Sequence, residues 1–281
     1  MDKIAVIGAG TMGSGIAQIS AQAGFEVIIR DLKEDYLEKG LTKIKKNLDK
    51  ATKKGLIDSE EKENVLDNIN LTTNIEELAD VDLVIEAIVE NLEIKQDVFQ
   101  KLDQICKEET ILATNTSALS ITQLATATTR PEKVLGIHFF NPVPVMKLVE
   151  LIKGMTTSQE SFDRAEEFIA QVDKEVVKVE EAPGFIVNRI LIPMVNEAAF
   201  LLTEGVASAE DIDQAMKLGA NHPLGPLALG DLIGLDVCLA IMETLYDEFK
   251  DSKYRPAPLL RKKVRAKQLG RKTGQGFYNY K

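Results

Sequence analysis

A glycine-rich turn near the start of the chain constrains its fold more than any other segment. The short apolar run Lys3–Ile7 leads into the sequence GAGTMG at positions 8–13, and a helical pattern follows through about Ala23. A second apolar run, Glu26–Arg30, comes next and ends before Asp31. Strand, glycine-rich turn, helix and strand in this order predict a βαβ unit, in which a helix joins two parallel strands.

The three glycines of this turn have separate predicted tasks. Gly8 allows the tight turn, Gly10 lets the backbone approach a pyrophosphate, and Gly13 lets the helix pack closely on the strand. The free amides and positive dipole end of the helix suit that pyrophosphate. Asp31 lies 21 positions after Gly10, which suits it to accept hydrogen bonds from a ribose 2′-hydroxyl. A 2′-phosphate would meet like charge there, although Arg30 is adjacent, so the motif favours NAD over NADP.

Apolar runs recur along the chain as far as position 179, with helical patterns between several of them. They are Val81–Ile88, Ile111–Thr114, Val134–Phe139, Val149–Ile152 and Val176–Val179. Such alternation predicts a mostly parallel sheet that is covered by helices on both faces. After Ala182-Pro183-Gly184 we find helical patterns and no convincing strand. We therefore expect an α/β domain over residues 1–183 and a smaller all-α domain over residues 184–281.

Two long apolar-periodic helices are predicted in the second domain, over Phe185–Leu202 and Leu232–Phe249. Pro193 lies inside the first and should kink it, because proline removes an amide donor. The apolar side chains of this first helix are numerous for a monomer. They include Phe185, Ile186, Ile190, Leu191 and Leu201. Pairing of two chains through the second domain is therefore our hypothesis.

Charge and cysteine content narrow the classes of partner and cofactor. The chain has 44 acidic and 34 basic residues, a net charge of −10, which disfavours binding to nucleic acid. It has two cysteines, Cys106 and Cys238, and two histidines, so we expect no Cys/His metal centre. We find neither a signal peptide nor a membrane span, and we expect a reduced, cytoplasmic protein.

His138 is the first candidate catalytic residue. It stands at the end of the predicted strand Val134–Phe139, the position at which open α/β sheets bind ligands. The turn sequence NPVP at 141–144 follows, and the next apolar run carries Glu150, which a turn brings beside His138. A carboxylate on one imidazole nitrogen leaves the other to exchange a proton, as hydride transfer between an alcohol and a ketone requires. From the spacing alone, His138 could equally well be an ordinary core histidine that is held by a hydrogen bond.

Three polar residues and a run of lysines are further candidates. Ser117 is placed to donate to a substrate oxygen, Asn115 to line a cofactor cleft, and Asn188 to face the cleft between the domains. The sequence alone favours plainer interpretations, a Ser/Thr turn and an asparagine on a helix surface.

Residues 39–54 contain seven lysines and one acid. Lys43, Lys46, Lys50 and the pair at 53–54 recur at spacings of three and four, so they share one helical face. A solvated basic surface is the ordinary explanation. The alternative is a clamp for the phosphates of a carrier such as coenzyme A.

Six segments together resemble the L-3-hydroxyacyl-CoA dehydrogenase family over the whole chain. They are GAGTMG with Asp31, VIEAIVENLEIK (84–95), NTSALSI (115–121), HFFNPVPVMKLVE (138–150), PGFIVNR (183–189) and KTGQGFY (272–278). The histidine-containing segment is far more specific than the glycine fingerprint. In length the chain is similar to short bacterial members that act on 3-hydroxybutyryl-CoA.

The resemblance implies a Rossmann-type first domain, a helical second domain that forms a homodimer, and NAD as cofactor. It also implies a reversible reaction of acetoacetyl-CoA and NADH to (S)-3-hydroxybutyryl-CoA. His138 matches the family's catalytic histidine and Glu150 its carboxylate partner, while Ser117 and Asn188 match substrate-contacting positions. The positions that match the surroundings of NAD are Gly8, Ala9, Gly10, Thr11, Met12, Gly13, Asp31, Glu90, Lys95, Asn115, Ser117, Asn141 and Lys272.

For the coenzyme A phosphates, the resemblance points to Lys50 and Lys54, whereas Asn47 stands where some relatives have serine.

Three other functions remain as alternatives. A dehydrogenase of carrier-free hydroxy acids would not need the lysine face, and a longer-chain 3-hydroxyacyl-CoA dehydrogenase would keep the same site. A non-enzymatic dinucleotide-binding protein, like the crystallin relatives of this fold, would not need the polar set around His138.

Overall fold

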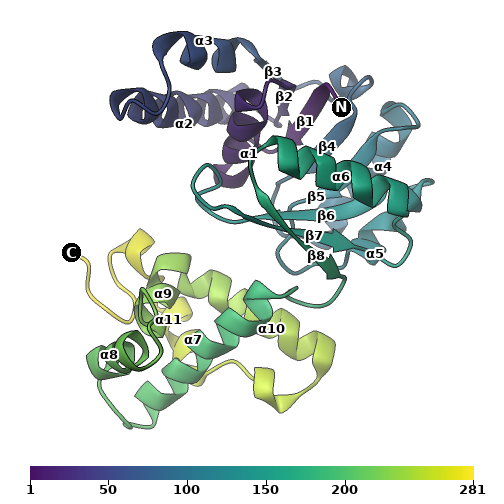
Figure 1. Ribbon diagram of the computed structural model, residues 1–281. Helices are drawn as coiled ribbons and strands as arrows, with labels where there is room; N and C mark the ends of the chain where they lie inside the picture. Colours follow the sequence, from purple (N-terminus) through teal and green to yellow (C-terminus); the bar gives the residue numbers. More distant parts are fainter. The chain divides into compact units, whose positions relative to one another are not determined.

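The computed structural model describes all 281 residues and divides into two compact units, Met1–Glu181 and Ala182–Lys281 (Figure 1). The first unit contains one eight-stranded sheet with the order β3-β2-β1-β4-β5-β6-β7-β8. The strands are β1 Lys3–Ile7, β2 Glu26–Arg30, β3 Ile69–Thr72, β4 Leu83–Glu86, β5 Ile111–Thr114, β6 Val134–Phe139, β7 Leu148–Lys153 and β8 Glu175–Glu180.

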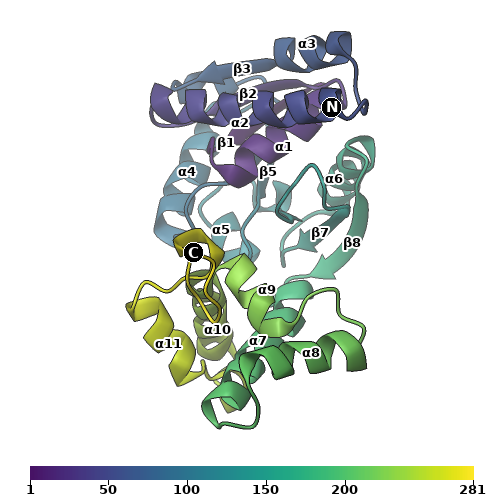
Figure 2. The same ribbon diagram turned by 90° about the vertical axis from the view of Figure 1, so that its left-hand side faces the viewer.

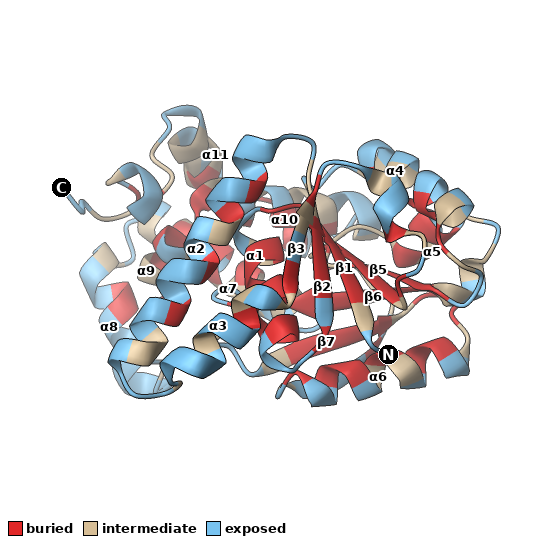
Figure 3. Cartoon of the chain, turned by 90° about the horizontal axis from the view of Figure 1, so that it is seen from above, coloured by how far each residue is buried: buried red, intermediate tan, exposed pale blue.

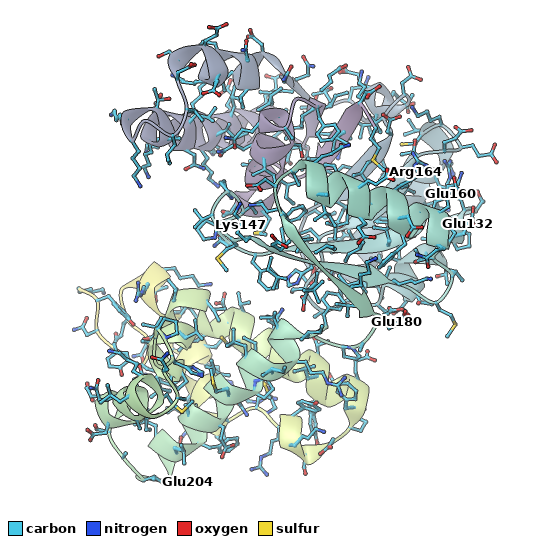
Figure 4. The ribbon with its side chains drawn as sticks, in the orientation of Figure 1. Glu132, Lys147, Glu160, Arg164, Glu180 and Glu204 are labelled. Carbon is cyan, nitrogen blue, oxygen red and sulfur yellow. The ribbon has the colours of Figure 1, made fainter.

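The sheet has the doubly wound topology that the sequence predicts. Its first six positions follow the strand order of a Rossmann fold, with the reversal of direction next to β1. All neighbouring strands pair in parallel except β6 and β7, which are antiparallel. Strands β7 and β8 are parallel neighbours. Lys147, immediately before β7, and Glu180, at the end of β8, therefore lie toward opposite ends of this pair (Figure 4). The expected α/β fold class is confirmed.

Strand β3 is absent from the sequence prediction. It has only four residues, lies at the sheet edge, and has just its two end residues, Ile69 and Thr72, buried. A strand this short and half exposed carries too few apolar residues to show a periodic pattern.

Helices cover both faces of the sheet. They are α1 Thr11–Gln22, α2 Glu34–Lys53, α3 Ser59–Asp67, α4 Leu92–Ile105, α5 Ile121–Ala125 and α6 Gln159–Gln171, with short 3₁₀ turns η1 Ile75–Leu78 and η2 Pro131–Lys133. One core cluster joins α1, α2 and α6 to the strands, and α1 lies next to α2 (Figure 2). Figure 3 shows buried residues concentrated in the strands and exposed residues on the outer sides of α2 and α3.

Helix α2 is amphipathic because its apolar and basic residues follow the same helical period. Leu37, Ile44 and Leu48 are buried at spacings of about one or two turns. Gly40 is also buried, and a Cβ there would lie 2.9 Å from the Ala9 carbonyl oxygen, so α2 approaches the glycine-rich turn closely. The predicted lysine face is exposed to solvent, and only its first part lies near that turn.

The second unit is all-α, as the sequence predicts. Its helices are α7 Val187–Thr203, α8 Ala209–Gly219, α9 Pro226–Ile233, α10 Leu235–Phe249 and α11 Pro258–Arg265, with 3₁₀ turns η3 Ser252–Tyr254 and η4 Arg271–Thr273. The core of this unit joins α7, α10 and α11. Within α7, Pro193 is accommodated inside the helix. No helix in either unit combines the length and apolar composition that crossing a membrane requires.

The prediction of a helix over Leu232–Phe249 is wrong at its start. Gly234 has φ +108 and separates α9 from α10, because only glycine adopts this conformation without strain. The apolar run continues across the break, which is why periodicity alone does not reveal it.

The C-terminal segment is fixed by one buried carboxylate. Asp231 accepts hydrogen bonds from the backbone amides of Phe277 at 2.8 Å and Tyr278 at 2.9 Å, and from the hydroxyl of Tyr280 at 3.1 Å. A Cβ at Gly276 would lie 1.9 Å from an Asp231 carboxylate oxygen, so glycine is required there. This packing explains much of the KTGQGFY segment in structural terms.

Candidate active site

The glycine-rich turn has the backbone geometry of a dinucleotide site. Gly8 has φ +100, and a Cβ there would lie 2.7 Å from the Ala87 carbonyl oxygen. A Cβ at Gly13 would lie 1.7 Å from the Gly8 carbonyl oxygen, so the close approach of α1 to the turn after β1 requires glycine at position 13. Around Gly10 no atom lies within 4 Å of a Cβ position. Gly10 caps α1 without a side-chain hydrogen bond, which leaves helix amides available to an anion.

The Asp31 carboxylate accepts from two backbone amides, one of which belongs to this turn. The Ala9 amide donates to Asp31 Oδ2 at 2.7 Å, and the Leu32 amide donates to Oδ1 at 2.6 Å. A cavity of about 1060 Å³ is lined by Gly8, Gly10 and Asp31, together with apolar side chains from the segments after β4 and in α4. Its size is that of a nucleotide pocket, and its donor set fits a ribose and a pyrophosphate. These residues therefore fit NAD.

The lysine face meets this cavity at one end. Lys43 lines the cavity, whereas Lys50 and Lys54 stand exposed further along α2, with Lys54 as its C-cap. Asn47 donates from Nδ2 to Gln18 Oε1 at 3.1 Å, so its amide is engaged with α1.

His138 and Glu150 face each other across the antiparallel strands β6 and β7. They are direct partners in the register, and His138 Nδ1 lies 2.7 Å from Glu150 Oε2. Both side chains are buried, with exposed fractions of 8% for His138 and 1% for Glu150. The Phe140 ring lies beside the imidazole at 4.5 Å between centroids. A buried carboxylate at this distance holds the Nδ1–H tautomer of the neutral ring and stabilises the protonated ring.

Glu86 is a central residue that sequence reasoning missed. It ends β4, is completely buried, and accepts three hydrogen bonds. Its Oε1 accepts from the Ile88 amide at 2.7 Å and from Lys95 Nζ at 2.6 Å, and its Oε2 accepts from Thr114 Oγ1 at 2.7 Å. The available signal was an acid inside the apolar run 81–88, where a burial cost is expected.

Glu90 extends this network to the end of β5. Its Oε2 lies 3.4 Å from Lys95 Nζ, and its Oε1 accepts from Thr116 Oγ1 at 2.6 Å and from the Ser117 amide at 2.9 Å. Ser117 Oγ also donates to Oε1 at 3.2 Å. Glu90, Lys95 and Ser117, which the sequence singles out separately, therefore form one cluster beyond the carboxyl ends of β4 and β5.

The remaining candidates are spread over both units. Asn115 Oδ1 accepts from the Phe139 amide at 2.9 Å, which joins the end of β5 to the strand that carries His138. Asn141 is exposed in the turn after β6. In the second unit, Asn188 is half-buried in the first turn of α7, and Lys272 Nζ lies 2.7 Å from an Asp236 carboxylate oxygen.

Comparison with known proteins agrees with this fold. A family model described as "3-hydroxyacyl-CoA dehydrogenase, NAD binding domain" matches residues 3–182, and one described as its C-terminal domain matches residues 184–280. The protein is thus an oxidoreductase that uses NAD. It belongs to the 3-hydroxyacyl-CoA dehydrogenase family.

Individual relatives match over nearly their full length. The chain is 58% identical to 3-hydroxybutyryl-CoA dehydrogenase of Clostridioides difficile over 278 residues, which covers 99% of each chain. It is 45% identical to the human mitochondrial hydroxyacyl-coenzyme A dehydrogenase, covering 99% of this chain and 91% of that one. The crystal structure of (S)-3-hydroxybutyryl-CoA dehydrogenase from Ralstonia eutropha superimposes with a TM-score of 0.97 at 48% identity, covering 100% and 99%.

Proposed function

We propose that the protein interconverts acetoacetyl-CoA and (S)-3-hydroxybutyryl-CoA with NADH and NAD. The observation that carries this proposal is the buried His138–Glu150 pair at 2.7 Å in a chain with an NAD-binding turn. The names of relatives that are 58% and 48% identical support the four-carbon substrate. A longer-chain 3-hydroxyacyl substrate is the second candidate, because the human relative is named without a chain length.

In this proposal the first unit holds the cofactor. The amides of the glycine-rich turn bind the pyrophosphate, and Asp31 receives the ribose hydroxyls. The bound nicotinamide supplies or accepts the hydride. Around it we place Glu90, Lys95, Asn115, Asn141 and Lys272, with Ala9, Thr11 and Met12 in the turn. The like charge of Asp31 disfavours a 2′-phosphate, which supports NAD over NADP.

His138 moves the proton. During reduction, Nε2 of the protonated imidazole gives its proton to the oxygen on C3 as the carbonyl becomes an alcohol. Glu150 holds Nδ1 and stabilises the positive charge before that transfer. In the reverse direction, the neutral ring takes the hydroxyl proton. General acid–base assistance of this kind accelerates reactions by about 10²–10⁴-fold.

Substrate contacts complete the proposal. Ser117 and Asn188 hold the ketone and thioester oxygens, and Lys50 and Lys54 bind the phosphates of coenzyme A.

We also propose a homodimer that forms through the second unit, and a cytoplasmic location. Both cysteines are free, as is usual in a reducing compartment.

A spectrophotometric assay of NADH oxidation tests the substrate assignment. We expect turnover of acetoacetyl-CoA, a weaker response to a ten-carbon 3-ketoacyl-CoA, and little or none with free acetoacetate. Equal rates with free acetoacetate would favour a dehydrogenase of carrier-free acids. No NADH oxidation with either acyl-CoA would favour the non-enzymatic alternative. Faster turnover of the ten-carbon substrate would favour the longer-chain enzyme.

A further inference from the structure

We infer that Glu86 is a positioning residue for this site, acting through Lys95 and Glu90 on the loop that carries Ser117. The inference deepens the proposed function, in which Ser117 contacts the substrate. The Glu86 backbone carbonyl accepts from the Asn115 amide at 2.7 Å, a bond that a change of side chain leaves in place. Its carboxylate is completely buried at the end of β4, so the charge acts on the loop only through the side chains that it holds.

The burial of Glu86 and Lys95 is the first observation. Both side chains are within 1% of complete burial, and their charged atoms lie 2.6 Å apart. Taking two charges out of water is costly, and an apolar pair of similar volume is often as stable or more so. Global stability therefore gives a weak explanation for this ion pair. A better explanation for the pair is that it holds neighbouring groups in place.

The second observation is which groups the hydrogen bonds of the Glu86 carboxylate connect. Glu86 Oε1 joins Lys95 to the Ile88 amide in the turn after β4, and Oε2 joins Thr114 at the end of β5. The carboxylate thus fixes two neighbouring strand ends and the Lys95 ammonium together. Lys95 in turn lies between Glu86 and Glu90, at 2.6 Å and 3.4 Å.

The third observation is where the network ends. One oxygen, Glu90 Oε1, accepts from Thr116 Oγ1, from the Ser117 amide and from Ser117 Oγ. Glu90 is 40% exposed, so its position depends on these donors and on the Lys95 charge. Without the Glu86 charge, Lys95 is drawn toward Glu90, and the Glu90 carboxylate no longer keeps its place under Ser117.

The substitution Glu86→Gln tests this inference, because it keeps the size of the side chain and removes the charge. We expect hydrogen–deuterium exchange at the Ser117 amide, followed by mass spectrometry, to become at least about tenfold faster. We also expect kcat/KM for acetoacetyl-CoA to fall at least about tenfold, because small misplacements of binding groups cost rates of this order. The matched control is Asp213→Asn, which removes the charge of a buried carboxylate that holds the Leu227 and Ala228 amides. It should lose thermal stability without changing either readout.

A double variant guards against simple unfolding of Glu86→Gln. Glu86→Gln with Lys95→Met removes both buried charges, so stability should recover while exchange at Ser117 stays fast. Exchange at the wild-type rate in both variants would overturn the inference and assign the pair a purely structural role. A wild type that does not oxidise NADH with acetoacetyl-CoA would contradict the proposed function, while the exchange rates would still decide the role of Glu86.

Discussion

At the scale of single residues, the sequence indicates candidate polar side chains but not the hydrogen-bond partners that other elements supply to them. Ser117 follows β5, His138 lies near the end of β6, and Glu150 lies inside β7, each beside or within an apolar run that the sequence predicts. Glu86 lies in the same apolar run as Val84 and Ile85, and only the structure shows its three donors. A single sequence carries no signal for these contacts, because Thr114 and Lys95 come from other elements.

Cofactor preference is also set at this scale. Asp31→Asn keeps an acceptor for a backbone amide but removes the charge that disfavours a 2′-phosphate, with Arg30 adjacent. We expect the ratio of kcat/KM for NADH to that for NADPH to fall at least about tenfold. The control Asp58→Asn, at the N-cap of α3, should leave this ratio unchanged. An unaltered ratio in Asp31→Asn would remove Asp31 from the role of specificity residue.

At the scale of elements, the sequence predicts strands that are long or buried and misses features with little apolar pattern. The bounds of β1, β2, β5 and β6 agree with the predicted runs, because these strands are fully or largely buried. The edge strand β3 and the break between α9 and α10 were missed. A half-exposed edge lacks apolar residues, and a single glycine with positive φ leaves the apolar periodicity around it intact.

Helix α2 carries a prediction about substrate affinity. If its exposed lysines bind the phosphates of coenzyme A, Lys50→Glu with Lys54→Glu should raise KM for acetoacetyl-CoA at least about fivefold at low salt. KM for NADH should stay within about twofold, and the effect should shrink as ionic strength rises. Lys217→Glu on α8 is the control for a general change in net charge. An unchanged KM in the double variant would leave α2 as a solvated surface.

The junction of β1 and β4 gives a prediction about pH. Burial alone would raise the pKa of Asp82, but a hydrogen bond from Lys107 and two from the Asp2 and Lys3 amides lower it to about 2. The ionised carboxylate therefore stabilises the fold above its ordinary pKa of 3.8, and this stabilisation is lost as pH falls toward 2.

Thermal unfolding of Asp82→Asn checks this pH dependence. The variant should have a lower Tm than the wild type at pH 7, and the difference should shrink as pH falls from about 4 toward about 2. A difference in Tm that stayed constant over this range would show that the charge of Asp82 does not contribute.

At the scale of the whole molecule, the second unit presents apolar side chains to solvent in a single chain. Leu218 on α8, Ile190 on α7 and Leu232 on α9 are 76%, 69% and 53% exposed. Phe185, which the sequence grouped with this surface, is instead buried. If a second copy of the chain covers these side chains, their apolar area is removed from water, which stabilises the association of the two chains.

Sedimentation or light scattering tests the homodimer. We expect a mass of twice 31.0 kDa at micromolar concentration. Ile190→Glu should shift the mass toward the monomer, because a buried unpaired charge is costly at an interface, whereas Met155→Glu, at an exposed position of the first unit, serves as the control. A wild type that stays at 31.0 kDa would contradict pairing through this unit.

In the proposed reaction, one imidazole, that of His138 held by Glu150, moves the proton while a hydride is transferred. The most direct measurement is kcat of His138→Gln with acetoacetyl-CoA, together with the Kd of the variant for NADH. We expect a loss in kcat of at least about 100-fold with Kd within about twofold of the wild type. Turnover at the wild-type rate would contradict it.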